Sequence, residues 1–105
     1  MNKTVNIMMM KNNGKIIQSI MDAIDEINER YPEDKRLSKS VDTVLTGESG
    51  KLDSLGLVSF VVSVEERIQN DLGINISLAD EIGNIDGALR TPETLAEHIA
   101  NELQS

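Results

Sequence analysis

Residues 52–73 read LDSLGLVSFVVSVEERIQNDLG, and this stretch decides the fold class of the chain. Apolar residues recur in it at three- and four-residue steps, which is the period of one face of an α-helix. The members of this stripe are Leu57, Val61, Val64, Ile68 and Leu72. Ser54 is a residue type favoured at the N-cap, and glycine, here Gly73, commonly follows a helix end. We therefore predict a helix over residues 54–72.

A second helix is predicted before this stretch, from about Lys15 to Tyr31. Its apolar stripe consists of Ile17, Ile20, Ile24, Ile27 and Tyr31. Pro32 should end it, because the residue before a proline is pushed out of the helical region. The acids on its other faces are predicted to form a solvated surface and not a metal site: Asp22, Asp25, Glu26 and Glu29.

The residues after Gly73 predict one short helix and one longer helix. Ser77, followed by Asp80 and Glu81, has the pattern of a helix start, although glycines interrupt the segment that follows. Thr91-Pro92-Glu93 gives an N-cap, a proline at the first helical position and an acid near the positive end of the helix dipole. The predicted buried face of the last helix is Leu95, Ile99 and Leu103, with Ala96 and Ala100.

The remaining segments complete the predicted architecture. Residues 33–53 should form a long loop that apolar residues anchor to the helices, namely Leu37, Val41, Val44, Leu45 and Leu52. Residues 1–13 show no clear period, so we expect a flexible N-terminal segment before a single domain at residues 14–105. The predicted fold is all-α: an antiparallel four-helix bundle of three main helices and one short helix, with a long loop between the first two.

Composition excludes several classes of function. The chain has no cysteine, so disulfides, thiolate metal sites and a cysteine nucleophile are ruled out. No apolar run approaches the ~20 residues that span a bilayer, so we expect a cytoplasmic protein without membrane insertion. Residues 54–105 carry nine acids against two arginines, within a net charge of −8 for the whole chain. Nucleic acid is therefore not expected as a partner.

Asp53-Ser54-Leu55 is the motif that carries chemistry, because a glycine-containing loop (Gly47 to Gly50) leads into it and a helix with Glu65-Glu66 follows. With this context the chain resembles the acyl carrier protein family over most of its length. The resemblance implies that a phosphopantetheinyl transferase attaches 4′-phosphopantetheine from coenzyme A to Ser54. The thiol of that arm would carry acyl groups as thioesters to acyl-loading and acyl-processing enzymes. The chain would be a monomer and would catalyse nothing itself.

The resemblance also implies a surface for partner enzymes on the helix after the serine. Its candidate residues here are Asp53, Leu55, Val58, Val62, Glu65 and Glu66. Two places that are usually acidic in fatty-acid carriers hold Gly56 and Ser59. We therefore expect docking through apolar contacts more than through ion pairs, and a specialised carrier of lipid, polyketide or surface-polysaccharide biosynthesis rather than the housekeeping fatty-acid carrier.

Two other interpretations stay open. The cargo could be an aminoacyl, aryl or D-alanyl group, with the arm still on Ser54. Alternatively, the chain could be an unmodified helical interaction module in which Ser54 is only a helix cap. His98 lies among polar residues of the last predicted helix, and a solvated side chain is expected there instead of a catalytic base.

Overall fold

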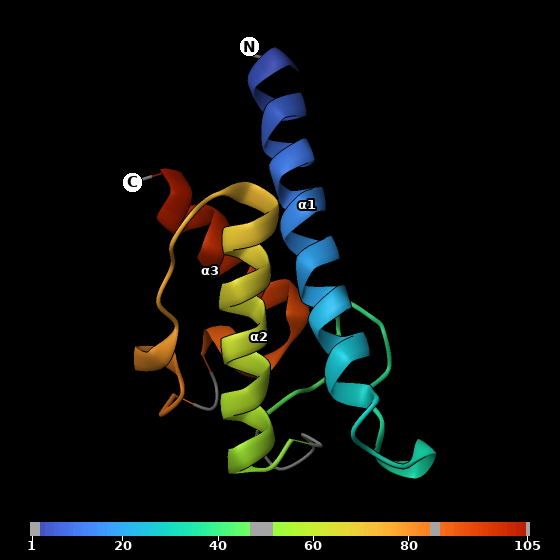
Figure 1. Cartoon of the computed structure of the whole chain (residues 1–105). Coiled ribbons are helices and arrows are strands. Elements are labelled where there is room, and N and C mark those ends of the chain that lie inside the picture. Colours follow the sequence, from blue (N-terminus) through green and yellow to red (C-terminus); the bar gives the residue numbers. More distant parts are fainter. Residues whose placement is uncertain (1–2, 47–51, 85–86, 105) are drawn as a thin grey trace.

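The computed structural model describes residues 3–46, 52–84 and 87–104, with side chains described from residue 14 to residue 103. Three α-helices form the fold: α1 (Lys3–Asn28), α2 (Ser54–Leu72) and α3 (Pro92–Gln104). No strand occurs in these ranges. α1 and α2 lie side by side and run in opposite directions, while α3 crosses behind them (Figure 1). The chain is thus all-helical and compatible with a helical bundle.

α1 differs from its predicted bounds at both ends. It begins at Lys3, well before the predicted start near Lys15, so most of the segment predicted to be flexible is helical. Residues 3–13 contain neither proline nor glycine, the two residue types that most oppose a helix. It ends at Asn28, and the N–H groups of Arg30 and Tyr31 bond the carbonyls of Ile27 and Asn28 at 3.0 and 3.1 Å in a tighter turn. The division into residues 1–13 and a domain 14–105 stays a prediction.

The α2 bounds agree with the prediction from the stripe and from Gly73. Gly73 adopts φ 69°, in the left-handed region, and its N–H bonds the carbonyl of Gln69 at 2.9 Å. Glycine adopts this conformation without the cost that a Cβ imposes, so it ends the helix cleanly. The core side of α2 consists of Leu57, Phe60, Val61, Val64 and Ile68.

α3 starts as its sequence predicts. The Thr91 hydroxyl accepts a hydrogen bond from the Thr94 N–H at 3.1 Å, and Pro92 is the first helical residue. Between α2 and α3, the described residues form two separate 3-10 turns, η2 (Ala79–Glu81) and η3 (Ala88–Arg90). The single short helix predicted from Ser77 is therefore not confirmed.

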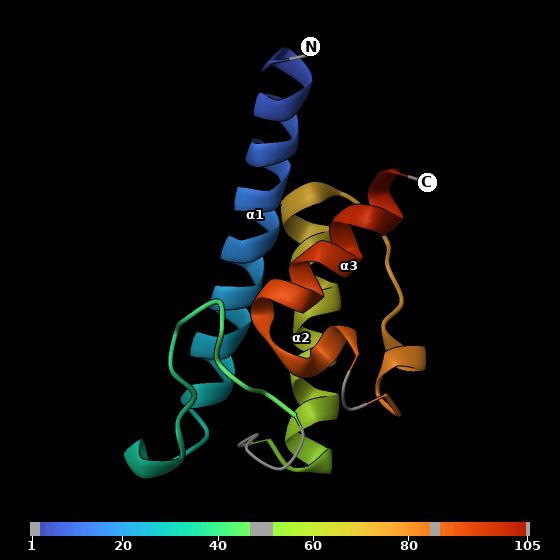
Figure 2. The same cartoon turned by 180° about the vertical axis from the view of Figure 1, so that it is seen from behind.

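The connection from α1 to α2 contains the 3-10 turn η1 (Glu33–Lys35) and lies on the same side of the α1–α2 pair as α3 (Figure 2). Leu37 and Leu45 are buried as predicted, whereas the predicted anchor Val41 is exposed. Backbone bonds hold this segment to η3 and to the start of α3: Leu45 N–H to Arg90 O at 2.7 Å, and Glu93 N–H to Val41 O at 2.9 Å. Val41 is thus held by its backbone instead of its side chain. Gly47 and Gly50 lie outside the described residues, so the long loop is not confirmed as a whole.

The core is aliphatic apart from Phe60. Ile16, Ile20 and Ile24 of α1 meet the inner face of α2 and Leu95 and Ile99 of α3, all fully or almost fully buried. None of the helices in the described ranges is long and apolar enough to cross a membrane.

Candidate functional site

Asp53 caps α2, and Ser54 does not. The Asp53 carboxylate accepts a hydrogen bond from the Gly56 N–H at 2.7 Å, and its carbonyl accepts from the Leu57 N–H at 2.8 Å. The predicted cap at Ser54 is therefore wrong by one residue. Both residue types are good caps, but the aspartate also brings a negative charge to the positive end of the helix dipole.

Ser54 is consequently the first residue of α2, and its side chain is exposed. Its hydroxyl has no hydrogen-bond partner among the residues that the structure describes. Because the adjacent carboxylate is bonded to Gly56, it is held at the cap and not at the serine oxygen. The arrangement presents an ordinary hydroxyl to solvent, where another enzyme can reach it.

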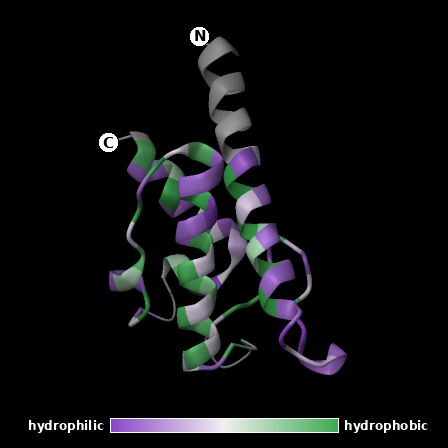
Figure 3. Cartoon of the chain, viewed as in Figure 1, coloured by the Kyte–Doolittle hydropathy of each residue, from purple (hydrophilic) through white to green (hydrophobic). Residues whose placement is uncertain are grey.

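The outward side chains of residues 54–62, which we call the open end of α2, are apolar or small. Leu55, Val58 and Val62 are 76%, 42% and 45% exposed and lie along one side of the helix. No side chain of the open end makes a hydrogen bond or ion pair to the described part of the chain. Figure 3 shows these first turns as green to white and the later turns of α2 as largely purple. The exposed apolar surface predicted from the sequence is therefore present.

Residues 63–72, the tied end of α2, are fixed by polar contacts to neighbouring segments. Ser63 and Arg67 donate to the Glu26 carboxylate of α1 at 2.7 and 3.0 Å. Asp71 accepts from the buried Ser19 of α1 at 2.7 Å. These contacts join α1 and α2 at a distance from Ser54.

Two predicted site residues, Glu65 and Glu66, belong to the tied end. The Glu65 carboxylate accepts a hydrogen bond from the Leu78 N–H at 2.7 Å and so anchors the segment after α2. Glu66 is exposed. Of the predicted partner surface, Asp53 and Leu55 flank Ser54, Val58 and Val62 follow along the open end, and the two glutamates lie further along the helix.

Glu26 changes the interpretation of the acids on α1. Hydrogen bonds from Ser63 and Arg67 lower the pKa of the Glu26 carboxyl below its ordinary value, and the Arg67 charge adds to this. Asp25 pairs with Lys39 at 2.8 Å. The side chains of Asp25 and Glu26 are 53% and 40% exposed, so they face solvent as predicted, and they also hold neighbouring segments.

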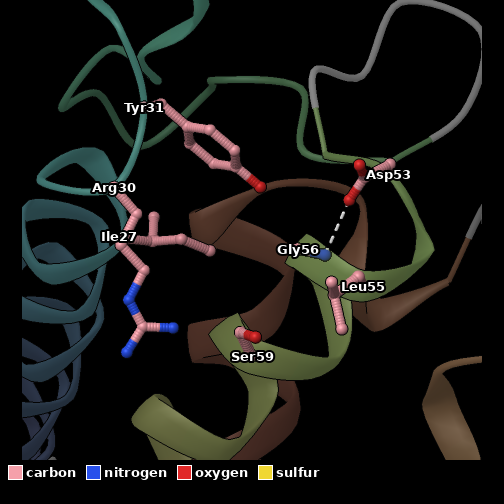
Figure 4. A pocket seen from close by; sticks show the side chains of 7 residues that line it. All are labelled: Ile27, Arg30, Tyr31, Asp53, Leu55, Gly56 and Ser59. Carbon is pink, nitrogen blue, oxygen red and sulfur yellow. Dashed lines mark hydrogen bonds between the residues drawn. The ribbon is translucent and has the colours of Figure 1, made fainter.

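A pocket of about 230 Å³ lies beside Asp53 and Leu55, the two neighbours of Ser54 (Figure 4). The end of α1 and the turn after it supply Ile27, Arg30 and Tyr31. The start of α2 supplies Gly56 and Ser59 as well as Asp53 and Leu55.

The Tyr31 ring extends toward Gly56, and the Arg30 guanidinium lies on the side of Ser59 (Figure 4). A Cβ at Gly56 would collide with the Tyr31 hydroxyl, so the glycine is needed for this close approach. Sequence reasoning missed the pocket. Gly56 in place of an expected acid was the one signal, but nothing in the sequence shows which residue faces it.

The His98 Nε2 on α3 lies 3.3 Å from the Glu102 Oε1, and the His98 side chain is 28% exposed, so it is only partly solvated.

Comparison of the chain with models of protein families, with characterised proteins and with solved structures gives no match in any of the three.

Proposed function

We propose that this chain is an acyl carrier protein that bears 4′-phosphopantetheine on Ser54. The proposal rests on the different roles of Asp53 and Ser54 at the start of α2. Asp53 caps the helix, which leaves the Ser54 hydroxyl exposed and without a partner in the described ranges. A serine needed only as a cap would have its oxygen bonded to a backbone N–H.

The covalent step is a phosphoryl transfer. The Ser54 oxygen would bond to the phosphorus that carries pantetheine in coenzyme A, the hydroxyl proton would leave, and the adenosine bisphosphate part would be released. A transferase with magnesium would supply the catalysis. The bound arm supplies a thiol, which the cysteine-free chain lacks.

The helix start suits the resulting phosphodiester. Anions near a helix N-terminus gain about 0.3–1 kcal/mol from free N–H groups and the helix dipole. The N–H groups of Ser54 and Leu55 precede the first helical bond, which runs from the Leu57 N–H to Asp53. An anion on Ser54 would therefore lie beside donors that the helix leaves free.

The remaining parts of the proposal follow the family resemblance. The chain would carry acyl groups between acyl-loading and acyl-processing enzymes of lipid, polyketide or surface-polysaccharide biosynthesis, as a cytoplasmic monomer without catalytic activity. Its full fold would be an antiparallel four-helix bundle in which a long loop at residues 33–53 precedes α2.

Partner enzymes would dock on the open end of α2. The exposed Leu55, Val58 and Val62 favour apolar contact over ion pairs there. Binding to a cognate synthase should therefore depend little on salt, and a steep loss of affinity between low and physiological salt would contradict this part of the proposal.

Intact-mass measurement tests the central proposal. Incubation of the purified chain with coenzyme A, magnesium and a phosphopantetheinyl transferase should add the mass of one arm. Ser54→Ala should add none, and Ser77→Ala, which removes another exposed serine, should behave as the parent chain. An unchanged mass of the parent chain would reject the carrier function.

The exposed apolar surface also suits a second candidate, an unmodified helical module that binds a protein through the open end. The same mass measurement separates the two candidates. A carrier of aminoacyl, aryl or D-alanyl cargo would gain the arm equally, and it would be distinguished by the enzyme that loads it.

A further inference from the structure

We propose that the pocket between the end of α1 and the start of α2 receives the phosphopantetheine arm, so that the arm rests against α1 when it is not engaged by an enzyme. This inference rests on the proposed function, because it needs the arm on Ser54. It adds a binding site for the arm on the side of α2 that faces the turn after α1.

The position of the pocket supports this occupant. Both sequence neighbours of Ser54, Asp53 and Leu55, line the pocket. An α-helix is only about 10–12 Å across with its side chains, so a group attached at the first residue has a short path to either side. A smaller hollow of about 20 Å³, room for about one water molecule, lies next along α2 and is lined by Glu26, Ile27, Arg30, Ser59 and Ser63. The pocket itself follows α2 from Asp53 to Ser59, roughly 9 Å at 1.5 Å per residue.

The chemistry of the lining also fits the arm, which has a phosphodiester, a hydroxyl, two amides and an apolar dimethyl group. Ile27 provides a buried apolar floor. The hydroxyls of Tyr31 and Ser59 can donate to amide carbonyls and accept from amide N–H groups, and neither has a partner within the described segments.

Arg30 supplies the positive charge that an anionic arm requires. Its side chain is exposed at the pocket, and it forms no ion pair with any described residue. Two carboxylates oppose this charge. Asp53 is kept at the helix cap by its bond to the Gly56 N–H, and Glu26, whose pKa the Arg30 charge helps to lower, accepts hydrogen bonds from Ser63 and Arg67. The guanidinium lies on the side of Ser59, so its N–H groups are suited to the carbonyl oxygens of an arm that extends along the pocket.

Gly56 gives the pocket its shape. Its backbone has no positive φ, so the helix itself does not require glycine at this position. What requires it is space, because a Cβ would collide with the Tyr31 hydroxyl. A glycine in the first turn of a helix costs up to about 1 kcal/mol relative to alanine, which is consistent with a role for the space it leaves.

Tyr31 makes the proposal testable, since it is the only tyrosine and the chain has no tryptophan. Tyr31 also lines a second hollow with Pro32, Asp34, Lys35 and Asp53, so its fluorescence reports on both hollows, and a substitution in the pocket is needed to tell them apart. The chain is compared before and after arm attachment, with loading verified by intact mass, and acrylamide quenching of the tyrosine emission is measured. An arm in the pocket should shield Tyr31, so loading should cause a loss of quenching.

Two substitutions of serine by leucine provide the matched comparison. Ser59→Leu fills the pocket and should abolish the difference between loaded and unloaded chains. Ser77→Leu makes the same change at an exposed serine outside the pocket lining and should preserve it. Gly56→Ala, which must displace Tyr31, is a second pocket variant and should also abolish the difference.

The outcomes separate the two proposals. An attached arm with unchanged quenching would overturn the pocket inference and leave the carrier function standing. A loss of quenching that persists in Ser59→Leu would place the shielding elsewhere and also overturn it. A parent chain that accepts no arm would reject the carrier function, and this inference with it.

Discussion

The two ends of α2 belong to one continuous helix but use their outward side chains differently. The tied end has bonds from Ser63, Arg67 and Asp71 to α1, and from Glu65 to the segment after the helix. The open end makes no such bonds within the described residues and exposes Ser54 with three large apolar side chains. Both ends contribute to the same buried core.

The tied end holds α2 to α1, whereas the open end presents Ser54 and its apolar neighbours to solvent. A partner that binds the open end displaces only water, because no intramolecular polar contact of these side chains has to break first. The tied end keeps α1 and α2 aligned while that happens. Substitutions should therefore affect stability at the tied end and function at the open end.

The largest contrast is expected between two valines at the junction of the ends. Val64→Ala should lower the free energy of unfolding by about 2 kcal/mol, because two buried methyl groups are lost and a cavity remains. Val62→Ala should change it by no more than about 0.5 kcal/mol, because that side chain is nearly half exposed. Urea unfolding measures both. Equal losses of unfolding free energy in the two variants would mean that Val62 is packed in solution and that the two ends of α2 do not differ.

A smaller contrast is expected between two serines. Ser19→Ala removes the bond to Asp71 and should lower the free energy of unfolding by about 1–2 kcal/mol. Ser59→Ala removes no bond to the described residues and should alter stability by less than about 0.5 kcal/mol. Thermal or urea unfolding of the two variants side by side gives the result. A loss for Ser59→Ala as large as that for Ser19→Ala would show that the open end has ties of its own.

Asp53 tests the capping role directly. Asp53→Ala should cost about 1 kcal/mol, whereas Asp53→Asn keeps an oxygen acceptor for the Gly56 N–H and should cost only a few tenths. Unfolding curves measure the difference. If Asp53→Ala left the free energy of unfolding unchanged, Ser54 would be able to cap the helix itself. The cap at Asp53 would then no longer explain why the Ser54 hydroxyl is free.

The smallest effect is the pH dependence from Glu26. Its pKa is lower in the folded chain than in the unfolded chain, so the unfolded state binds the proton first as pH falls below the ordinary value of about 4.5. The stability that this group contributes is thus complete above that pH and is lost as pH falls through the folded pKa. Glu26→Gln should flatten this part of the curve of unfolding free energy against pH, and an unaltered slope would show that the ties to Ser63 and Arg67 are not formed in solution.

The sequence was sufficient for α2 because the apolar stripe and Gly73 both define it locally. It could not choose between Asp53 and Ser54 as the cap, since adjacent residues of equally suitable type give the same pattern. It also predicted Val41 as an apolar anchor, whereas the backbone of Val41 makes the contact and its side chain is exposed. Sequence patterns indicate which residues are apolar, but they do not show which backbone hydrogen bonds fix a loop to the rest of the chain.

The pocket lay beyond prediction for a different reason. It forms where Tyr31 meets Gly56, two residues separated by the whole connection between α1 and α2. Periodicity describes each helix alone, and the angle at which the end of one reaches the start of another depends on packing. Arg30 and Ser59, both polar and unremarkable in sequence, acquire their possible roles only from that placement.

The most direct test of the central claim is to locate the arm on a single residue. Trypsin cleavage after Lys51 and Arg67 yields a peptide of residues 52–67 that contains Ser54, Ser59 and Ser63. After incubation with coenzyme A, magnesium and a transferase, fragmentation of this peptide in a mass spectrometer should place the added group on Ser54. A group on Ser59 or Ser63, or a peptide that remains unmodified, would contradict the account.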